Sequence, residues 1–387
     1  MKPLVRIAFF SLVTLCLTVA AGAREIRLGV AEALTGPVAK YGVPIRNGFI
    51  LAAEEINAGG GINGNKIVLV VEDEQGKKEE AINVFKKFIF QDKVLAIFGP
   101  TLSNSAFAAD PIAVQQKTVV FGTSNTAEGI TAIGPYVFRN SVAEADILPA
   151  VVRAAVKKLG LKKVAVIYGN DDSFTKSGYD VFLRAIKAEK LQVVDTETFA
   201  KGDIDFSAQL TKTKNRNPEA IICSALVEEG ANIILQARKL GVPERVRFIG
   251  GNGFNSAKLV EIAGKAAEGA ISGSPWFLDD PGAKNRAFVK SYTKKFGLPP
   301  DQFAAQAYDA LYIMTSGIKA LRLSGNLGKD RTALRDALPK VKNFSGVGGP
   351  FSFNENRDAE QKGRVLTIKN GKFTANGNDT PWQVRCR

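Results

Sequence analysis

The chain has 387 residues, of which 45% are hydrophobic, and it contains no histidine. This length corresponds to about two to three domains, and the apolar fraction is sufficient for packed cores. The absence of histidine excludes Ser-His-Asp and Cys-His catalytic sites and every metal site that needs an imidazole ligand. Carboxylate, lysine and cofactor chemistry remain open on composition alone.

Lys and Arg together number 52 and Asp and Glu 38, which gives a formal net charge of +14. Such an excess is compatible with nucleic acid or an anionic surface as a partner. The basic residues, however, are scattered among acids, as in KKEE at 77–80 and KNRNPE at 214–219, and form no stripe with aromatic residues. We therefore expect solvated helix faces and no nucleic-acid binding.

Residues 1–23 have the pattern of a secretory signal peptide. Lys2 and Arg6 precede an apolar run at 7–20, and small residues follow at 21–23. The apolar run is shorter than the ~20 residues that span a bilayer, which disfavours a membrane anchor. We expect cleavage after residue 23 and export. In an exported protein Cys223 and Cys386 are able to pair, although the sequence gives no distance between them.

From residue 25 onward, short β-branched segments alternate with amphipathic segments in two series. The first series predicts strands at 26–34, 66–74, 94–99 and 118–124 and helices at 47–57, 77–91 and 104–116. The second predicts helices at 144–160, 177–190, 205–215 and 228–241 and strands at 163–169, 192–199, 219–226 and 246–251. This order indicates parallel sheets with helices on both faces. Because the two series match in kind, we expect two similar lobes that face each other.

The last hundred residues are too few for a third lobe. They predict helices at 284–297, 302–325 and 330–341 and an antiparallel pair formed by 349–358 and 363–373. We expect these segments to complete the two existing lobes, so that the chain crosses between the lobes more than once. Several crossings make a hinge.

The loops that follow the predicted strands are the candidate binding loops, because ligands of doubly wound sheets lie beyond the carboxyl ends of the strands. Three loops of the first series are rich in Ser, Thr, Gly and Asn, and place Ser103, Ser124, Asn125 and Thr126 close to helix starts. Hydroxyl groups and free N–H groups at helix N-termini bind carboxylates. Ordinary helix capping uses the same residue types, so both interpretations stay open.

Tyr41 and Phe174 occupy matching places in the two series, just before a helix. Facing each other across a cleft, the two rings would sandwich an apolar part of a ligand; a hydrophobic staple or a core position is the alternative. The acidic pairs at 171–172 and 228–229 lie beside helix starts, which indicates favourable helix-dipole placement. No GxGxxG motif follows a predicted strand at nucleotide-binding spacing, and GxxxxGK[ST] is absent from the sequence.

Several of these segments, in this order, are similar to those of one family. LTGPVAKYG, FGPTLSNS, FGTSNTAEGIT, VAVIYGNDDSFTKSG and AAEGAISGSPWF resemble the periplasmic solute-binding proteins of branched-chain amino acid ABC transporters, across about residues 25 to 370. The resemblance implies an α/β fold of two doubly wound Rossmann-like lobes joined by a three-crossing hinge, the type I periplasmic binding fold. The expected N-terminal lobe comprises 24–142 plus 275–361, and the C-terminal lobe 143–274 plus 362–387.

The resemblance also implies a function. A protein of this kind captures a small solute in the cleft between its lobes and delivers it to ABC permease subunits in the inner membrane. We accordingly expect a periplasmic monomer with no catalytic residues, no cofactor and no metal, since no nucleophile and base set is recognisable either.

The resemblance assigns site residues on one side of the cleft. In the family, hydroxyl and backbone N–H groups of the N-terminal lobe hold the ligand carboxylate, and the matching positions here are Ser103, Ser124 and Thr126, with Asn125 between the last two. Tyr41 matches an aromatic residue that packs on the ligand. Phe174 matches a position at which the family often has tyrosine.

The other side of the cleft departs from the family pattern. Amino-acid binders place an acidic residue in the loop that corresponds to GGNGFN, where it pairs with the ligand ammonium, and here that position is Asn252. An amide does not neutralise a buried cation, and an unpaired charge in a closed cleft costs several kcal/mol. We therefore expect an aromatic or other organic acid without an α-ammonium, or an amide. The alternatives are a branched-chain amino acid, with Asp309 or Glu228 supplying the charge, and a periplasmic ligand sensor.

Overall fold

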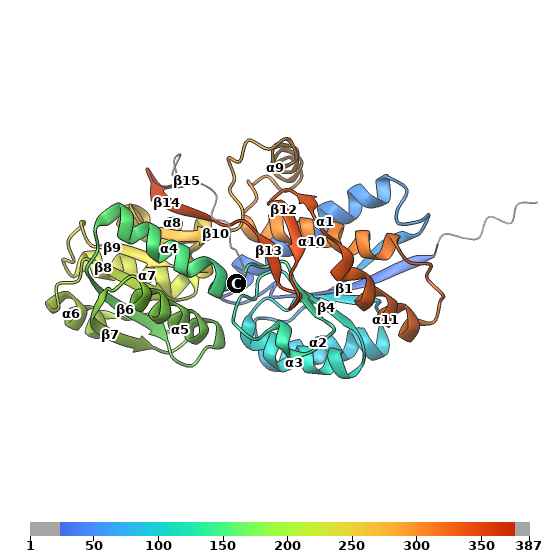
Figure 1. Ribbon diagram of the computed structural model, residues 1–387, viewed down its shortest axis with the longest axis horizontal. Helices are drawn as coiled ribbons and strands as arrows, with labels where there is room; N and C mark the ends of the chain where they lie inside the picture. Colours follow the sequence, from blue (N-terminus) through green and yellow to red (C-terminus); the bar gives the residue numbers. More distant parts are fainter. Residues whose placement is uncertain (1–23, 376–387) are drawn as a thin grey trace, which may run out of the picture.

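The computed structural model describes residues 24–375, so the predicted signal peptide, the last twelve residues and Cys386 lie outside the described part. Two sheets flanked by helices form two lobes that lie side by side (Figure 1). The expected α/β class and two-lobed architecture are confirmed. Within residues 24–375, none of the helices is long and apolar enough to cross a membrane.

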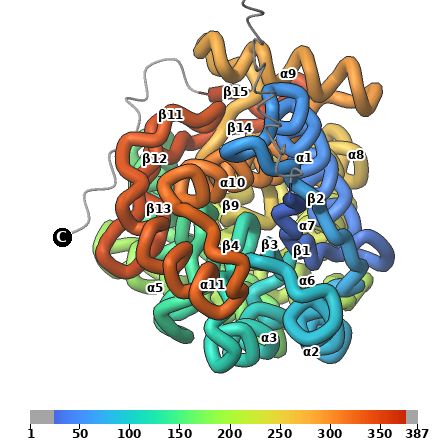
Figure 2. The backbone as a smooth tube through the Cα atoms, turned by 90° about the vertical axis from the view of Figure 1, so that its right-hand side faces the viewer, coloured from blue at the N-terminus to red at the C-terminus, as the bar shows by residue number. Residues whose placement is uncertain are grey.

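The N-terminal lobe is built on a five-stranded parallel sheet with the order β2-β1-β3-β4-β5. Its strands are β1 (Glu25–Glu32), β2 (Lys66–Asp73), β3 (Ala96–Phe98), β4 (Val119–Gly122) and β5 (Val137–Arg139). The helices of its first half are α1 (Ala39–Ala58), α2 (Lys78–Lys86), which continues into a π-helical turn (Lys87–Gln91), and α3 (Ser103–Gln115). Later segments add α9 (Ala283–Phe296), α10 (Gln302–Lys319) and α11 (Leu327–Ala337). Helix α10 packs along α1, as Figure 2 also shows.

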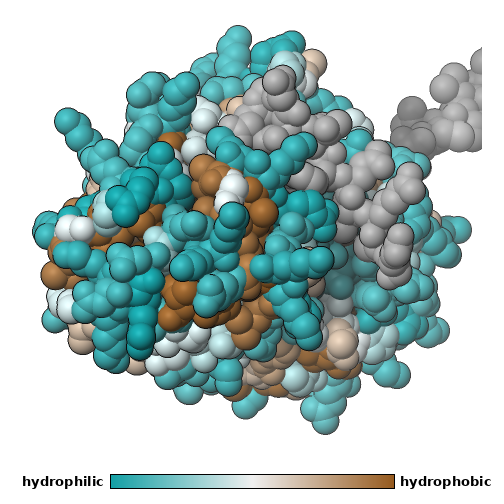
Figure 3. Space-filling view, turned by 60° about the vertical axis from the view of Figure 1, so that its left-hand side comes forward, coloured by the Kyte–Doolittle hydropathy of each residue, from teal (hydrophilic) through white to brown (hydrophobic). Residues whose placement is uncertain are grey.

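The C-terminal lobe is built on a seven-stranded sheet with the order β15-β14-β10-β9-β8-β6-β7. Its parallel strands are β6 (Lys163–Gly169), β7 (Gln192–Phe199), β8 (Ala220–Ser224), β9 (Arg247–Gly250) and β10 (Ile271–Ser274), and its helices are α4 (Glu144–Leu159), α5 (Ser173–Ala188), α6 (Ser207–Asn215), α7 (Val227–Lys239) and α8 (Ala257–Ala263). Hydrophilic residues cover most of the surface on this side of the molecule, between smaller hydrophobic areas (Figure 3). Cys223 is fully buried within β8 and is the one cysteine among residues 24–375, so its pairing with Cys386 stays untested.

The prediction that 349–358 and 363–373 form an antiparallel pair is wrong. Strand β12 (Gly349–Phe353) instead pairs with β11 (Phe344–Gly346) and β13 (Ala359–Gln361) in a small sheet of its own. Strands β14 (Arg364–Lys369) and β15 (Lys372–Ala375) pair with each other and extend the C-terminal sheet at β10. The two segments part because the chain passes from one lobe to the other between them.

The chain crosses between the lobes three times: after β5, after β10 and after β13. The first crossing is held by Arg139, which is buried and whose Nε lies 2.5 Å from Oδ1 of Asp358. The Glu144 N–H then donates to the Thr126 carbonyl oxygen at 3.1 Å. The three crossings agree with the expected hinge, while the residue limits of each lobe stay a prediction.

Among the elements whose lengths differ from the predicted ones, β1 and α1 do so for identifiable local reasons. Strand β1 stops at Glu32 because the next two N–H groups leave the ladder: Ala33 donates to Thr101 Oγ1 and Leu34 to Asp73 Oδ1, each at 2.8 Å. Helix α1 begins eight residues earlier than predicted and contains Pro44. One lost backbone hydrogen bond near its start is tolerated because the helix packs on α10.

Candidate functional site

A cleft lies where the carboxyl ends of the two parallel sheets face each other. The loops after β1, β3 and β4 approach it from the N-terminal lobe, and those after β6, β8 and β9 from the C-terminal lobe. They enclose a small cavity lined by Tyr41, Thr101, Leu102, Ser103, Ser124, Phe174, Leu226, Asn252, Gly253 and Phe303. Its volume, about 20 Å³, is close to the space needed for one water molecule. A solute therefore enters only when the lobes separate or the lining side chains move.

Two of the predicted hydroxyl residues reach this cavity from the N-terminal lobe. Ser103 is the first residue of α3, and its Oγ accepts a hydrogen bond from the Ala127 N–H at 3.3 Å. Ser124 Oγ donates to the Thr101 carbonyl oxygen at 2.7 Å. No side chain caps the N-terminus of α3. Hydroxyl groups and the positive end of a helix thus meet at one wall of the cavity, an arrangement that suits an anion.

Asn125 and Thr126 lie behind that wall and are not part of the cavity lining. Asn125 Nδ2 donates to the Pro100 carbonyl oxygen at 3.0 Å, and its own carbonyl oxygen accepts from Ser141 Oγ. Thr126 is buried, and its Oγ1 has no hydrogen-bond partner within residues 24–375. Their direct role in binding stays a prediction, and the contacts of Asn125 give it a structural role in joining the loops after β3 and β4.

The two predicted aromatic residues are on opposite lobes, and both line the cavity. The Tyr41 hydroxyl accepts from the Val227 N–H at 2.8 Å and donates to the Gly253 carbonyl oxygen at 3.2 Å, both in the C-terminal lobe. Burial raises the pKa of Tyr41 well above its ordinary value. The Tyr41 ring packs edge-on against Phe303, with 4.9 Å between centroids. Nothing near Phe303 in the sequence marked it as a site residue.

Asn252 also lines the cavity and is held through both ends of its amide. Its Oδ1 accepts a hydrogen bond from Gln302 Nε2. Its Nδ2 donates to the Ser124 carbonyl oxygen across the cleft at 3.5 Å. The position predicted to discriminate between ligands is therefore at the cavity surface, and it carries no charge.

The two acids considered as replacement partners for an ammonium group lie outside the cavity lining. Glu228 forms an ion pair with Lys40. Both oxygens of Asp309 accept hydrogen bonds from the backbone, from the Val347 N–H at 2.9 Å and the Gly348 N–H at 3.1 Å. Neither carboxylate is placed to meet a ligand charge in the cleft.

A third acid, Glu144, was not found from the sequence. It begins α4 directly after the first crossing, and its side chain lies behind the loop that carries Asn252, whose backbone N–H donates to it. Its Oε2 is buried with no hydrogen-bond partner in the described chain. Burial raises the pKa of Glu144 and so favours the uncharged acid.

The lobes also touch beside the cleft. The Asn104 amide in α3 contacts Asp172 and Ser173, and Glu128 contacts Ser177 and Arg184. Asp172 is the N-cap of α5, which is the helix-start placement that the sequence indicated. Together with Tyr41, these contacts hold the lobes closed over the cavity.

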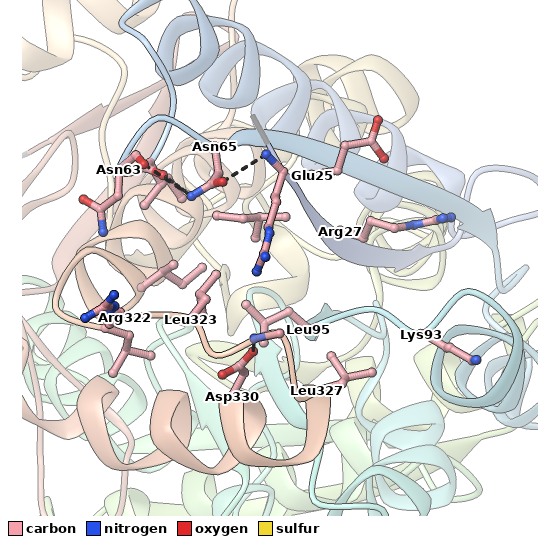
Figure 4. Close-up of a pocket in the computed structure, with 16 residues that line it drawn as sticks. Glu25, Arg27, Asn63, Asn65, Lys93, Leu95, Arg322, Leu323, Leu327 and Asp330 are labelled. Carbon is pink, nitrogen blue, oxygen red and sulfur yellow. Dashed lines mark hydrogen bonds between the residues drawn. The ribbon is translucent and has the colours of Figure 1, made fainter. Parts of the chain in front are cut away.

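A larger cavity, of about 540 Å³, lies at the other end of the N-terminal sheet (Figure 4). It is bounded by the start of β1 and by the segment after α10, and Leu95 and Leu323 lie near its centre while Arg27 and Arg322 extend outward. Ligands of parallel α/β sheets bind at the carboxyl ends of strands, and this cavity is at the amino ends. We therefore place the candidate site in the smaller interlobe cavity.

Two α/β lobes, three crossings and a cavity closed by both lobes define a ligand-binding protein that opens and shuts about a hinge. The chain matches the periplasmic binding protein family model over residues 25–372. It therefore belongs to the periplasmic binding protein family. Relatives are named as amino-acid-binding proteins and as substrate-binding proteins of transporters.

Three relatives illustrate the range of the match. A Leu/Ile/Val-binding protein of Citrobacter freundii is 27% identical over 372 residues, which cover 95% of each chain. The branched-chain amino acid transporter protein LivJ of Streptococcus pneumoniae, solved with isoleucine, is 30% identical, with TM-score 0.85 and coverage of 91% and 98% of the two chains. An ABC-transporter solute-binding protein of R. palustris, solved with benzoate, is 26% identical, with TM-score 0.83 and coverage of 93% and 97%.

Proposed function

We propose that this protein is the extracytoplasmic binding component of an ABC importer that captures a small carboxylate without an α-ammonium group, preferably an aromatic acid. The observation that carries the proposal is the composition of the cavity wall: none of its ten residues has a charged side chain. An ammonium group would find no counter-ion there and would stay unpaired in a desolvated site.

The two ends of the cavity suit different parts of such a solute. Ser103, Ser124 and the N-terminus of α3 offer hydrogen-bond donors and a positive dipole for a carboxylate. The rings of Tyr41, Phe174 and Phe303 offer apolar faces and edges, which suit an aromatic ring. Closure of the lobes buries the solute, and the closed form would then deliver it to a membrane permease.

Thermal-shift measurements with matched pairs of ligands test the proposal. The protein is first unfolded and then refolded, so that it carries no solute from its host. The pairs are 4-methylpentanoate with leucine and 3-phenylpropanoate with phenylalanine, in which the members differ only in the α-ammonium, and benzoate is added as an aromatic acid. A ligand at about 100 times its Kd adds roughly 2.7 kcal/mol, enough to raise Tm by a few degrees. Shifts confined to the acids that lack an ammonium support the proposal. Shifts confined to the amino acids contradict it.

A branched-chain amino acid is the second candidate, because Glu144 offers one buried carboxyl oxygen without a partner behind Asn252 and because several relatives are named for these amino acids. If leucine binds and Glu144 is its counter-ion, Glu144→Gln should weaken leucine at least tenfold and leave 4-methylpentanoate unchanged. Unchanged leucine binding in that variant would rule out Glu144 as the partner.

A further inference from the structure

The loop that opens α3 lies on two buried carboxyl groups. Glu32 ends β1 and Glu74 follows β2, and both side chains are fully buried. Thr101 Oγ1 donates to Glu32 Oε2 at 2.6 Å, and the Thr101 N–H donates to Glu74 Oε1 at 3.4 Å. Ser105 Oγ donates to Glu74 Oε2 at 3.2 Å. Two carboxyl groups thus hold both ends of the segment 101–105.

The same segment forms the proposed carboxylate-binding wall of the cleft. Thr101, Leu102 and Ser103 line the cavity, and the Thr101 carbonyl oxygen receives the Ser124 hydroxyl. One face of the loop is therefore turned toward the ligand and the other toward Glu74 and Glu32. A charge on either carboxyl group would act on a ligand anion through protein and not through bulk water, where it would be strongly screened.

No cation neutralises this pair. Among the described residues neither Glu32 nor Glu74 forms an ion pair with Lys or Arg, and Glu32 Oε1 has no hydrogen-bond partner. Burial raises the pKa of Glu74 to about 7 and that of Glu32 well above its ordinary value. The nearby negative charge of Asp73 also raises the pKa of Glu74, and Glu74 does the same to Glu32. At neutral pH a substantial fraction of Glu74 is therefore protonated.

The titratable groups around Glu74 come from three directions. Glu32 faces it from β1. Asp73, the preceding residue, is held as an anion by Thr35 and by backbone N–H groups, which lower its pKa. Lys77, at the start of α2, donates to Gln75 at the surface, and Asp110 is a buried acid further along α3. Of the acids in this set, Glu74 is the one whose pKa burial raises to about 7.

We propose that carboxylate capture in the cleft is coupled to protonation of Glu74, so that one solvent proton moves onto the Glu74 carboxylate when an anion binds to the loop above it. The proposal rests on the proposed function, because it requires the ligand carboxylate to lie at Ser103 and Ser124. A bound anion raises the pKa of Glu74 further. By linkage, affinity for the anion is highest where Glu74 is already protonated and falls as pH rises through the pKa of Glu74.

The coupling predicts a dependence on ligand charge. A carboxylate should lose about tenfold in affinity between about pH 6 and pH 8.5, because two negative charges separated by protein, at an effective dielectric constant of about 20, repel each other even with some screening by salt. Benzamide, which has the shape of benzoate without its charge, should show no such loss. Proton uptake should accompany the binding of benzoate and not that of benzamide.

Isothermal titration calorimetry at about pH 6, 7 and 8.5, in two buffers of different ionisation enthalpy, measures both Kd and protons taken up. The probes are benzoate and, for the second candidate function, leucine, whose carboxylate would meet the same loop. Wild-type protein should take up a fraction of one proton per ligand near pH 7. Glu74→Gln keeps an acceptor for the Thr101 N–H. Its affinity for benzoate should change less than about twofold between about pH 6 and pH 8.5.

Glu79→Gln is the matched control, because Glu79 lies in the first turn of α2 and is exposed. It should retain the wild-type dependence on pH. Binding without proton uptake in the wild-type protein, or an unchanged pH slope in Glu74→Gln, would overturn the coupling and leave the proposed function intact. Failure of every carboxylate to bind at any pH would overturn both. The proton count on wild-type protein requires no variant to fold.

Discussion

The side chain of Asn104 joins the two lobes through Asp172. Asn104 Nδ2 donates to Asp172 Oδ2 at 2.6 Å, and Asn104 Oδ1 accepts from the Ser173 N–H at 2.7 Å. Asn104 belongs to the first turn of α3, whereas Asp172 caps α5 with its other oxygen. Both ends of one buried amide are therefore used by the opposite lobe, and both hydrogen bonds form only when the cleft is shut.

Replacement of this amide should favour the open form. Asn104→Ala removes both hydrogen bonds and leaves a buried Asp172 oxygen without its partner, a change that costs about 1–2 kcal/mol in the closed form. We expect ligand affinity to fall roughly 5- to 30-fold. At the same sub-saturating ligand concentration, small-angle scattering should give a larger radius of gyration for Asn104→Ala than for the wild-type protein.

The Glu128–Arg184 ion pair provides the control for this variant. It also joins the lobes, but both side chains are exposed. Exposed pairs contribute at most about 1 kcal/mol, so Glu128→Gln should change affinity less than about fivefold. Equal effects of the two variants would contradict the role given to Asn104.

Tyr41 should act through its hydroxyl as well as its ring. Tyr41→Phe preserves the contact with Phe303 and removes the hydrogen bonds to Val227 and Gly253. Because it leaves a backbone N–H and a carbonyl oxygen unpaired in the closed cleft, we expect a loss of affinity of about 10- to 100-fold, measured by calorimetry. Wild-type affinity in Tyr41→Phe would show that the hydroxyl takes no part in closure.

Several of the residues that line the interlobe cavity could be named from the sequence, and their role in binding stays a prediction. Ser103 and Ser124 lie in the loops after β3 and β4, so the topology of a parallel sheet brings them to the same edge, whereas Asn252 follows β9 and faces them from the other lobe. Phe303 and Glu144 could not be found in this way. Phe303 reaches the cavity from α10, after the second crossing, and Glu144 follows the first crossing. Their positions depend on how the lobes are joined, which local sequence does not encode.

Asn252→Asp should change the preference of the site. The substitution adds a negative charge at the cavity wall, where it would pair with an α-ammonium and repel an uncompensated carboxylate. We expect the ratio of affinities for leucine and 4-methylpentanoate to rise at least tenfold. Calorimetric titration of both ligands into the wild-type protein and into Asn252→Asp gives this ratio. An unchanged ratio would show that residue 252 does not discriminate between ligands by their charge.

Buried acids should also make the fold itself sensitive to pH. Burial raises the pKa of Glu74 to about 7 and that of Asp309 to about 6, so the folded chain holds protons that the unfolded chain has already lost. Between about pH 5 and pH 8 the free energy of unfolding should therefore decrease as pH rises, by roughly 1–3 kcal/mol for Glu74 alone. Urea denaturation at both pH values measures the change.

Glu74→Gln should reduce this decrease, because the variant has no proton to lose at that position. A free energy of unfolding that is constant or that increases with pH over this interval would contradict the buried-acid assignment. Glu79→Gln, which removes an exposed acid, should leave the decrease in the free energy of unfolding with pH unchanged.

The burial of these acids and the pairing of the last strands depend on tertiary packing and could not be predicted from local sequence. Glu32 ends β1 and Glu74 follows β2, positions at which many acids are exposed, and only the packing of α3 over them shows that they are buried. Likewise, 349–358 and 363–373 have the alternation of a hairpin, but the third crossing falls between them and sends each to a different sheet. Alternation predicts strands, whereas pairing partners depend on the path of the chain.

The most direct test of the account compares two ligands that differ by one group. Calorimetric titration of 4-methylpentanoate and of leucine into refolded wild-type protein measures whether the uncharged cavity wall rejects an ammonium group. We expect 4-methylpentanoate to bind at least tenfold more tightly than leucine, because the ammonium of leucine would lie unpaired beside Asn252. Tighter binding of leucine would contradict it.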